Sequence, residues 1–168
     1  ALIYSQVPSV AAGMFTTNKV RAACVTVSKK HLRSGKAQAI IANSGNANCM
    51  TGAQGLKDAE QMAKAAARAL GIEASEVCVG STGIIGKPLP VQKIEAVIPA
   101  LVDVLSRKGS ETAARSIMTT DTKLKEVAAE IMLGGKKVRI GAIAKGAGMI
   151  HPEMALPHAT MLCFVTTA

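Results

Sequence analysis

Aromatic side chains are nearly absent from this sequence, which has no tryptophan and carries only Tyr4, Phe15 and Phe164. Proteins that bind single-stranded nucleic acid usually stack bases on aromatic rings, so the shortage argues against that class. The sequence also shows no signal peptide and no apolar run of about 18 residues, so neither secretion nor a membrane span is indicated. We expect neither nucleic acid nor a membrane as a partner.

Acidic residues are scarce: 11 Asp and Glu stand against 20 Lys and Arg, which gives a formal net charge of +9. A basic protein suits nucleic acid, an anionic membrane surface or anionic small molecules. The basic residues here are scattered, in runs no longer than two. This pattern favours anionic small-molecule substrates over a polyanion.

Cysteine pairs with metal-binding spacing are also lacking. The four cysteines, Cys24, Cys49, Cys78 and Cys163, form no C-x-x-C motif, and none has ligand spacing with a histidine. We expect buried, reduced thiols, a reducing cytoplasmic compartment and no metal site.

The chain has 168 residues, of which 49% are hydrophobic and 18% charged. This composition excludes global disorder and predicts one domain over residues 1–168. Both ends lie in strand-like sequence, at residues 1–4 and 165–168, and we therefore expect a fragment or subunit of a longer product.

The order of apolar patterns predicts an α+β domain with mixed sheets and helices. Thr51 and Gln54 have the spacing of a capping box at the start of a helix that Gly71 ends. Gly134 and Gly135 predict a two-residue hairpin turn. Strands are expected at residues 24–27, 39–42, 76–80, 127–133, 136–144 and 161–167, and helices at 51–70, 90–106 and 110–118.

Two turns have residues suited to binding an oxyanion. Ser81-Thr82-Gly83 follows a strand, and there a glycine N–H and a threonine hydroxyl can face a developing negative charge. The Asn- and Gly-rich loop at 43–52 can place amides around an anion or a carbonyl. For both segments, a plain turn is the alternative.

Further candidates are Lys145, Asp121 and Thr160. The segment from Lys145 resembles half of a phosphate loop but lacks the full spacing, so Lys145 is better suited to bind a carboxylate. Asp121 is interpreted as a helix cap or turn former. Thr160 is either an ordinary residue at a strand start or a nucleophile, if cleavage before it frees an α-amine that accepts its proton.

Six segments occur in the order found in one known family. The sequence resembles the α subunit of the bifunctional glutamate N-acetyltransferase, or ornithine acetyltransferase, of arginine biosynthesis. The matching segments are GMFTTN from Gly13, NSGNANCMTG from Asn43, STGIIG from Ser81, MTTDT from Met118, KGAGMIHPEMA from Lys145 and TMLCFVTT from Thr160. The resemblance implies a layered sandwich similar to the DmpA/ornithine acetyltransferase fold, which is N-terminal-nucleophile-like.

The resemblance also implies a mechanism. The precursor would cut itself between Ala159 and Thr160, so that residues 160–168 begin the β chain. Thr160 would then carry the acetyl group from N-acetylornithine to glutamate. Thr82 and Gly83 match the family's oxyanion-hole pair, and Thr119 and Lys145, with Thr160, match its substrate-binding positions. Lys145 would suit the substrate α-carboxylate.

The resemblance implies further expectations about assembly. The β chain is the implied partner, in a heterotetramer of two α and two β chains, and the α chain alone would be inactive. No cofactor is expected, although acetyl-CoA serves some family members as a second acetyl donor. This sequence carries four extra residues, 156–159, directly before Thr160, which would lengthen the cleavage loop. A related self-processing aminopeptidase and a basic, non-enzymatic binding module are the alternatives.

Overall fold

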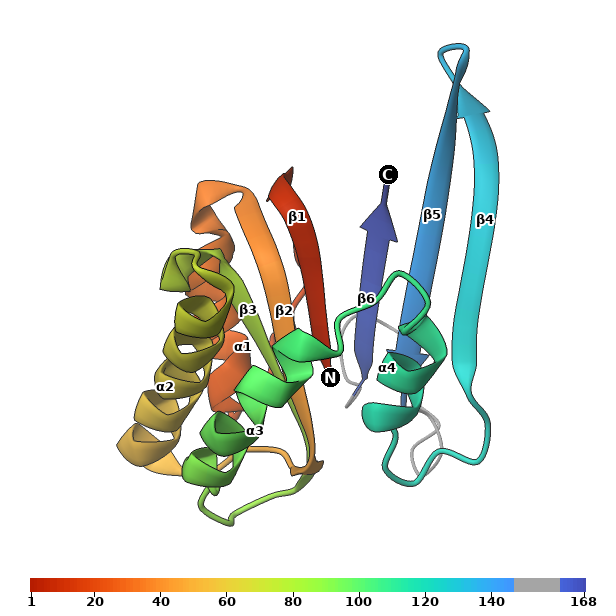
Figure 1. Cartoon of the computed structure of the whole chain (residues 1–168). Coiled ribbons are helices and arrows are strands. Elements are labelled where there is room, and N and C mark those ends of the chain that lie inside the picture. The colour runs from red at the N-terminus through yellow and green to blue at the C-terminus, as the bar shows by residue number, and fades with distance from the viewer. Residues whose placement is uncertain (147–160) are drawn as a thin grey trace.

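The computed structural model describes residues 1–146 and 161–168, which form two three-stranded sheets with helices. Sheet A has the order β1-β2-β3, with β1 (Leu2–Val10) antiparallel and β3 (Val77–Ile84) parallel to the central β2 (Lys36–Asn46). Sheet B has the order β4-β5-β6 and is antiparallel throughout. Figure 1 shows the two sheets side by side, with β6 nearest to sheet A.

Sheet B consists of a long hairpin and the last strand. Its members are β4 (Lys125–Leu133), β5 (Lys136–Lys145) and β6 (Leu162–Thr167). The predicted hairpin is confirmed, because Leu133 pairs with Lys136 across the two glycines. The glycines have φ values of 57° and 76°, which suit a tight turn that matches strand twist. The predicted final strand is confirmed as well.

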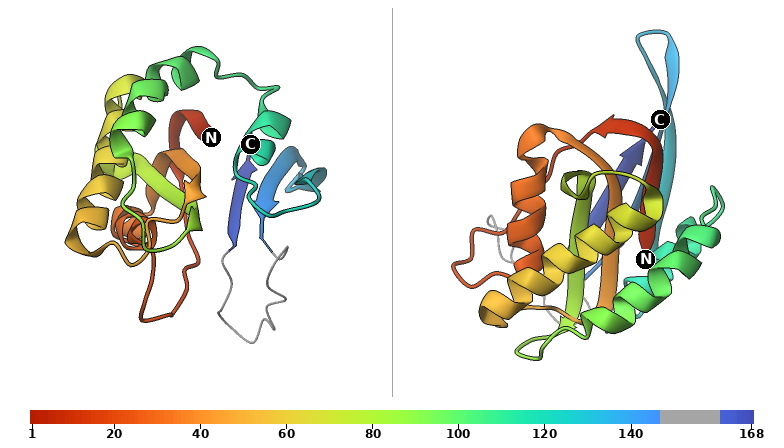
Figure 2. Two further views of the ribbon diagram at one scale, coloured as in Figure 1. Left: turned by 90° about the horizontal axis from the view of Figure 1, so that it is seen from below. Right: turned by 60° about the vertical axis from the view of Figure 1, so that its left-hand side comes forward.

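Helices cover the face of sheet A that points away from sheet B, as the view from below in Figure 2 shows. Alternation along the strands explains the layering, because neighbouring side chains point to opposite faces. Ile41 and Val79 belong to the core shared with the helices, whereas Ile3 and Ala42 belong to a second cluster with Phe164 of β6. The covering helices are α1 (Ala23–His31), α2 (Gly52–Leu70) and α3 (Val91–Asp103).

The strand predicted at residues 24–27 is wrong, since this segment lies in α1. Its β-branched residues favour a strand locally, but Cys24, Val27 and Ser28 recur at helical spacing and are buried together. The Ser28 hydroxyl donates to the carbonyl of Val79 at 2.8 Å and accepts the Val79 N–H at 2.7 Å. Helix α1 thereby covers the outer edge of β3.

The helix predicted from residue 51 is confirmed as α2, and Gly71 ends it with a φ of 69°. The capping box is wrong, because the Thr51 hydroxyl donates to Asn48 and Gln54 donates to Asp58.

The remaining helices are close to the predictions. The helix expected at 90–106 is α3, which contains Pro99, and the helix expected at 110–118 is α4 (Ser110–Ser116), which packs against β4 and β5. Two short 3₁₀ turns, Leu32–Ser34 and Ala74–Glu76, complete the described elements.

The four cysteines are free thiols, but they are not all buried. Cys24 is buried, Cys49 and Cys78 are partly buried, and Cys163 on β6 is exposed. Burial raises the pKa of the Cys78 thiol to about 11. The expectation of buried thiols is therefore wrong for Cys163.

No helix among the described residues is both long enough and apolar enough to cross a membrane.

Candidate active site

The two sheets meet where β3 faces β6, and a glycine allows their close approach. A Cβ on Gly80 would lie 3.2 Å from the ring of Phe164 and 3.6 Å from the side chain of Leu162. Such distances are at or inside ordinary contact, so a larger side chain would push the sheets apart. The residues that follow Gly80 on β3 therefore lie close to the end of β5.

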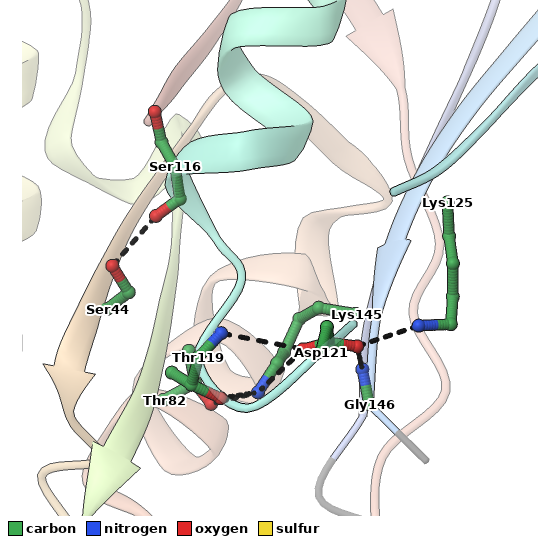
Figure 3. Close-up of polar contacts among 8 residues, drawn as sticks. All are labelled: Ser44, Thr82, Ser116, Thr119, Asp121, Lys125, Lys145 and Gly146. Atoms are coloured by element: carbon green, nitrogen blue, oxygen red, sulfur yellow. Dashed lines mark hydrogen bonds and ion pairs between the residues drawn. The ribbon is translucent and has the colours of Figure 1, made fainter. Parts of the chain in front are cut away.

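Lys145, the last residue of β5, reaches across to β3. Its ammonium donates to Thr82 Oγ1 at 2.9 Å and to Thr119 Oγ1 at 2.6 Å, as Figure 3 shows. Lys145 is only 4% exposed, and Thr82 is 1% exposed. The structure thus brings three of the predicted site residues, from β3, the segment after α4 and β5, into one buried polar cluster.

Asp121 is the negative charge of this cluster. Its Oδ1 accepts the Lys125 ammonium at 2.7 Å and the Gly146 N–H at 2.9 Å. Its Oδ2 accepts the Thr119 N–H at 3.4 Å and lies 3.9 Å from Lys145 Nζ. Burying an ammonium is costly unless a counter-ion accompanies it, and Asp121 supplies that counter-ion.

The interpretation of Asp121 as a helix cap or turn former was incomplete. Its bond to the Thr119 N–H is turn-like, but its other partners lie on β4 and at the end of β5. The role of Asp121 follows from the burial of Lys145, because a buried ammonium requires a nearby carboxylate. Sequence spacing alone gives no such pairing.

Burial opposes ionisation of Asp121, but hydrogen bonds from Lys125, Gly146 and Thr119 outweigh it and lower the pKa of this carboxyl to about 2. A carboxyl whose pKa is lower in the folded chain than in the unfolded chain stabilises the fold. The full contribution is present at pH values above the unfolded-state pKa of about 3.9. That contribution, about 2 kcal/mol, is lost as the pH falls through the folded-state value.

Asp121→Asn is therefore expected to lower the free energy of unfolding at pH 7 and to flatten its dependence on pH between about 5 and 2. Urea unfolding of the complete gene product at several pH values measures both effects. Glu130→Gln is the comparison variant: Lys137 and Arg139 also lower the pKa of Glu130, but they do so on the exposed hairpin, so this change should flatten the pH dependence much less than Asp121→Asn. Equal pH slopes for wild type and Asp121→Asn would contradict the expectation.

Gly83 lies directly after Thr82, at an irregularity in the β2–β3 pairing. Its φ is 131°, and a Cβ there would lie 2.3 Å from the carbonyl carbon of Gly45 and 2.6 Å from the amide nitrogen of Asn46. Both contacts are with backbone, which cannot rotate away. Only glycine fits this position, and the two backbones meet beside Thr82.

The polar side chains of the loop at 43–52 are largely engaged in hydrogen bonds within the loop and to the start of α2, which favours the plain-turn interpretation. Asn48 is fully buried with a φ of 47°, donates to the carbonyl of Gly55 at 2.8 Å and accepts from Thr51 at 2.7 Å. The first part of the segment continues β2 to Asn46. Ser44 there donates to the carbonyl of Ser116, which ties sheet A to α4.

A cleft of about 370 Å³ opens beside the contact between Gly45 and Gly83. It is lined by residues 43–46 at the end of β2, residues 87–90 and Ile94. In the part of the chain that the structure describes, no three His, Cys, Asp or Glu side chains gather as metal ligands. Thr160 and the four extra residues before it, 156–159, which include Ala159 of the predicted cleavage site, lie outside the described residues.

Solved structures with the same arrangement define the class of protein. One is the ornithine acetyltransferase of Mycobacterium tuberculosis complexed with ornithine, with 40% identity and a TM-score of 0.82 over 90% of this chain and 81% of that chain. Another is the arginine biosynthesis bifunctional protein of Bacillus halodurans, with 39% identity and a TM-score of 0.83 over 90% and 80% of the two chains. The expected fold is confirmed.

Sequence comparison identifies the family. The ArgJ family model matches residues 1–168. An arginine biosynthesis bifunctional protein of Symbiobacterium thermophilum is 53% identical over 99% of this chain and 40% of its own length. A glutamate N-acetyltransferase of Methanothermobacter thermautotrophicus is 50% identical over 95% of this chain and 39% of its own length. The chain belongs to the ArgJ family and spans about 40% of the length of such relatives.

Proposed function

We propose that this chain is the α-chain part of an acetyltransferase that moves the acetyl group of N-acetylornithine to glutamate in arginine biosynthesis. Membership of the ArgJ family along the whole chain carries the proposal. The cluster of Thr82, Thr119 and Lys145 supports it independently, because three separate segments converge on one buried polar point. A buried cation next to two hydroxyls suits a substrate with carboxylate and carbonyl oxygens.

The chemistry proceeds in two acyl transfers. After cleavage between Ala159 and Thr160, the free α-amine of Thr160 accepts the proton of its own hydroxyl, whose oxygen attacks the acetyl carbonyl. The C–N bond of N-acetylornithine breaks, and ornithine leaves with that proton on its amine. The amine of glutamate then attacks the acetyl-threonine ester, which yields N-acetylglutamate and restores the Thr160 hydroxyl.

The α-chain residues have distinct roles in this proposal. The Thr82 hydroxyl and the Gly83 N–H stabilise the oxyanion of each tetrahedral intermediate. Thr119 and Lys145 contact the substrate, and the charge of Lys145 attracts its α-carboxylate. This chain spans about 40% of the length of its relatives. We therefore infer that a β chain beginning at Thr160 completes the site, and that the assembly is an α2β2 heterotetramer.

The first test is an acetyl-transfer assay on the complete gene product. With N-acetylornithine and glutamate, we expect ornithine and N-acetylglutamate in equal amounts and no free acetate. Denaturing intact-mass analysis should show a species that begins at Thr160. No added metal or cofactor is expected to be needed, and replacing N-acetylornithine by acetyl-CoA shows whether that thioester is a second donor.

Other results would identify other functions. Release of acetate or hydrolysis of peptides, independent of glutamate, would indicate a self-processing aminopeptidase. Salt-dependent retention on nucleic acid without acetyl transfer would indicate a basic binding module. A single uncut chain without activity would overturn the proposed mechanism for this product.

A further inference from the structure

We propose that Lys145 is also a positioning residue for the oxyanion hole: it fixes the Thr82 hydroxyl as a hydrogen-bond donor to the acetyl carbonyl oxygen. The inference rests on the proposed function and adds a role beyond attraction of a carboxylate. It begins from the two shortest contacts of the Lys145 ammonium, both with threonine hydroxyl oxygens.

The direction of these hydrogen bonds is fixed by chemistry. An ammonium group has three donors and no acceptor, whereas a hydroxyl has one donor and can also accept. Thr82 Oγ1 and Thr119 Oγ1 must therefore each accept from Lys145, and each keeps its own hydrogen for another partner. Among residues 1–146 and 161–168, the Thr82 hydroxyl accepts from Lys145 and donates to no group. Its hydrogen is thus available to an acceptor, such as a carbonyl oxygen.

The charge of Lys145 then strengthens that donor. A hydroxyl that accepts a bond from a cation is polarised and donates more strongly, and the effect is larger where water is excluded. Both partners are almost completely buried, at 4% and 1% exposed. The gain grows as negative charge develops on the carbonyl oxygen, so it lowers the barrier more than it favours substrate binding.

The position of Lys145 is held from the opposite side. Asp121 Oδ2 lies 3.9 Å from the ammonium, and Asp121 Oδ1 is bound by the amide of Gly146, the residue that follows Lys145. The carboxylate therefore contacts both the side chain and the backbone at the end of β5. Lys145 is the link through which Asp121 and Thr119 act on Thr82.

Steady-state kinetics of the complete gene product test the inference. Lys145→Met is expected to lower kcat at saturating substrates by about tenfold or more, since loss of one oxyanion-hole donor costs about a hundredfold to a thousandfold. Loss of ground-state binding alone would raise KM and leave kcat unchanged. In a Thr82→Val background, which has no hydroxyl to polarise, the added change at Lys145 should have little further effect on kcat. Thr82→Ser should retain the sensitivity to Lys145.

Matched controls separate this role from others. Lys137→Met changes a lysine of the same strand whose partner is Glu130 on the exposed hairpin, and it should leave kcat within about twofold. Ornithine has the α-carboxylate but no acetyl carbonyl, so its dissociation constant reports the carboxylate contact separately. Circular dichroism and intact mass check that each variant folds and is cleaved.

The outcomes are distinguishable. Two results would overturn the role of Lys145 but leave the proposed function intact. One is a Lys145→Met enzyme with raised KM and unchanged kcat, and the other is an equal loss of kcat with and without the Thr82 hydroxyl. Absence of acetyl transfer by the wild type overturns the proposed function. If Lys145→Met does not fold, lysine side-chain ¹⁵N NMR of Thr82→Ser and Thr82→Val replaces it. The Lys145 ammonium signal should stay protected from exchange in Thr82→Ser and lose protection in Thr82→Val, and equal protection in both contradicts the link.

Discussion

Thr160→Ala is expected to abolish both chain cleavage and acetyl transfer. The proposed cycle holds the acetyl group as an ester of the Thr160 hydroxyl, and alanine has no oxygen to form that ester. Removal of a catalytic nucleophile typically costs several orders of magnitude in kcat, so we expect a loss of at least about a thousandfold. The acetyl-transfer assay and denaturing intact-mass analysis of the same preparation measure the two effects.

Two variants serve as controls for Thr160→Ala. Thr160→Ser keeps a hydroxyl on a residue that can also expose an α-amine after cleavage, and it should retain part of both activities. Thr166→Ala removes a threonine hydroxyl from the same segment, on β6, where it donates to the carbonyl of Gly141 at 3.5 Å, and should leave both activities nearly unchanged. If the Thr160→Ala enzyme still transferred acetyl groups at a wild-type rate, another residue would have to be the nucleophile.

Structural features that depend only on residues adjacent in the sequence were predictable. The Gly134-Gly135 turn and its two strands follow from a local signal, and so does the end of α2 at Gly71. The segment at 24–27 shows where local preference fails. There, β-branched residues favoured a strand, but burial against β3 at helical spacing stabilises a helix. Propensity differences of well under about 1 kcal/mol per residue are easily outweighed by such packing.

The candidate site could be predicted only in part. Thr82 and Lys145 were candidates from their residue types and local sequence, and Thr119 came from the family resemblance, but no residue spacing shows that the three lie together. Thr82 and Lys145 are 63 positions apart, and their contact depends on how sheet B packs on sheet A. Asp121 was in a matching motif but received a local role, because its partners at Lys125 and Gly146 become visible only once β4, β5 and the segment after α4 are placed.

The structure also shows that Asn48 and Gly83, which both lie in the matching segments, serve different purposes. Asn48 serves the turn itself, since its amide is engaged by Gly55 and Thr51. Gly83 serves the approach of two backbones beside Thr82. Asn48 and Gly83 are both residue types that tolerate positive φ, and both have it in the structure. Only Gly83 belongs to the proposed oxyanion hole. The difference is one of packing, and it makes Gly83 the more sensitive position.

Gly83→Ala is expected to destabilise the fold by about 3 kcal/mol or more and to abolish acetyl transfer. Two effects add. The φ of 131° is one that an alanine rarely adopts, and the new Cβ would meet the backbone of Gly45 and Asn46 at 2.3–2.6 Å. Relief of that overlap requires β2 and β3 to separate where they hold Thr82, so the geometry of the proposed oxyanion hole changes together with stability. Urea unfolding and the acetyl-transfer assay of the complete gene product measure the two losses.

Gly35→Ala is the control for placing an alanine at a positive φ without a steric overlap. Gly35 also has positive φ, at 70°, but a Cβ there meets nothing within 4 Å. We expect it to cost about 1 kcal/mol, the ordinary penalty for a left-handed alanine, and to leave kcat unchanged. The difference between the two variants then contains the cost of forcing the β2 and β3 backbones apart, together with the extra backbone strain of an alanine at a φ of 131° instead of 70°. If both variants cost the same free energy of unfolding, the close approach of Gly83 to Gly45 does not limit the fold, which contradicts the expectation for Gly83→Ala.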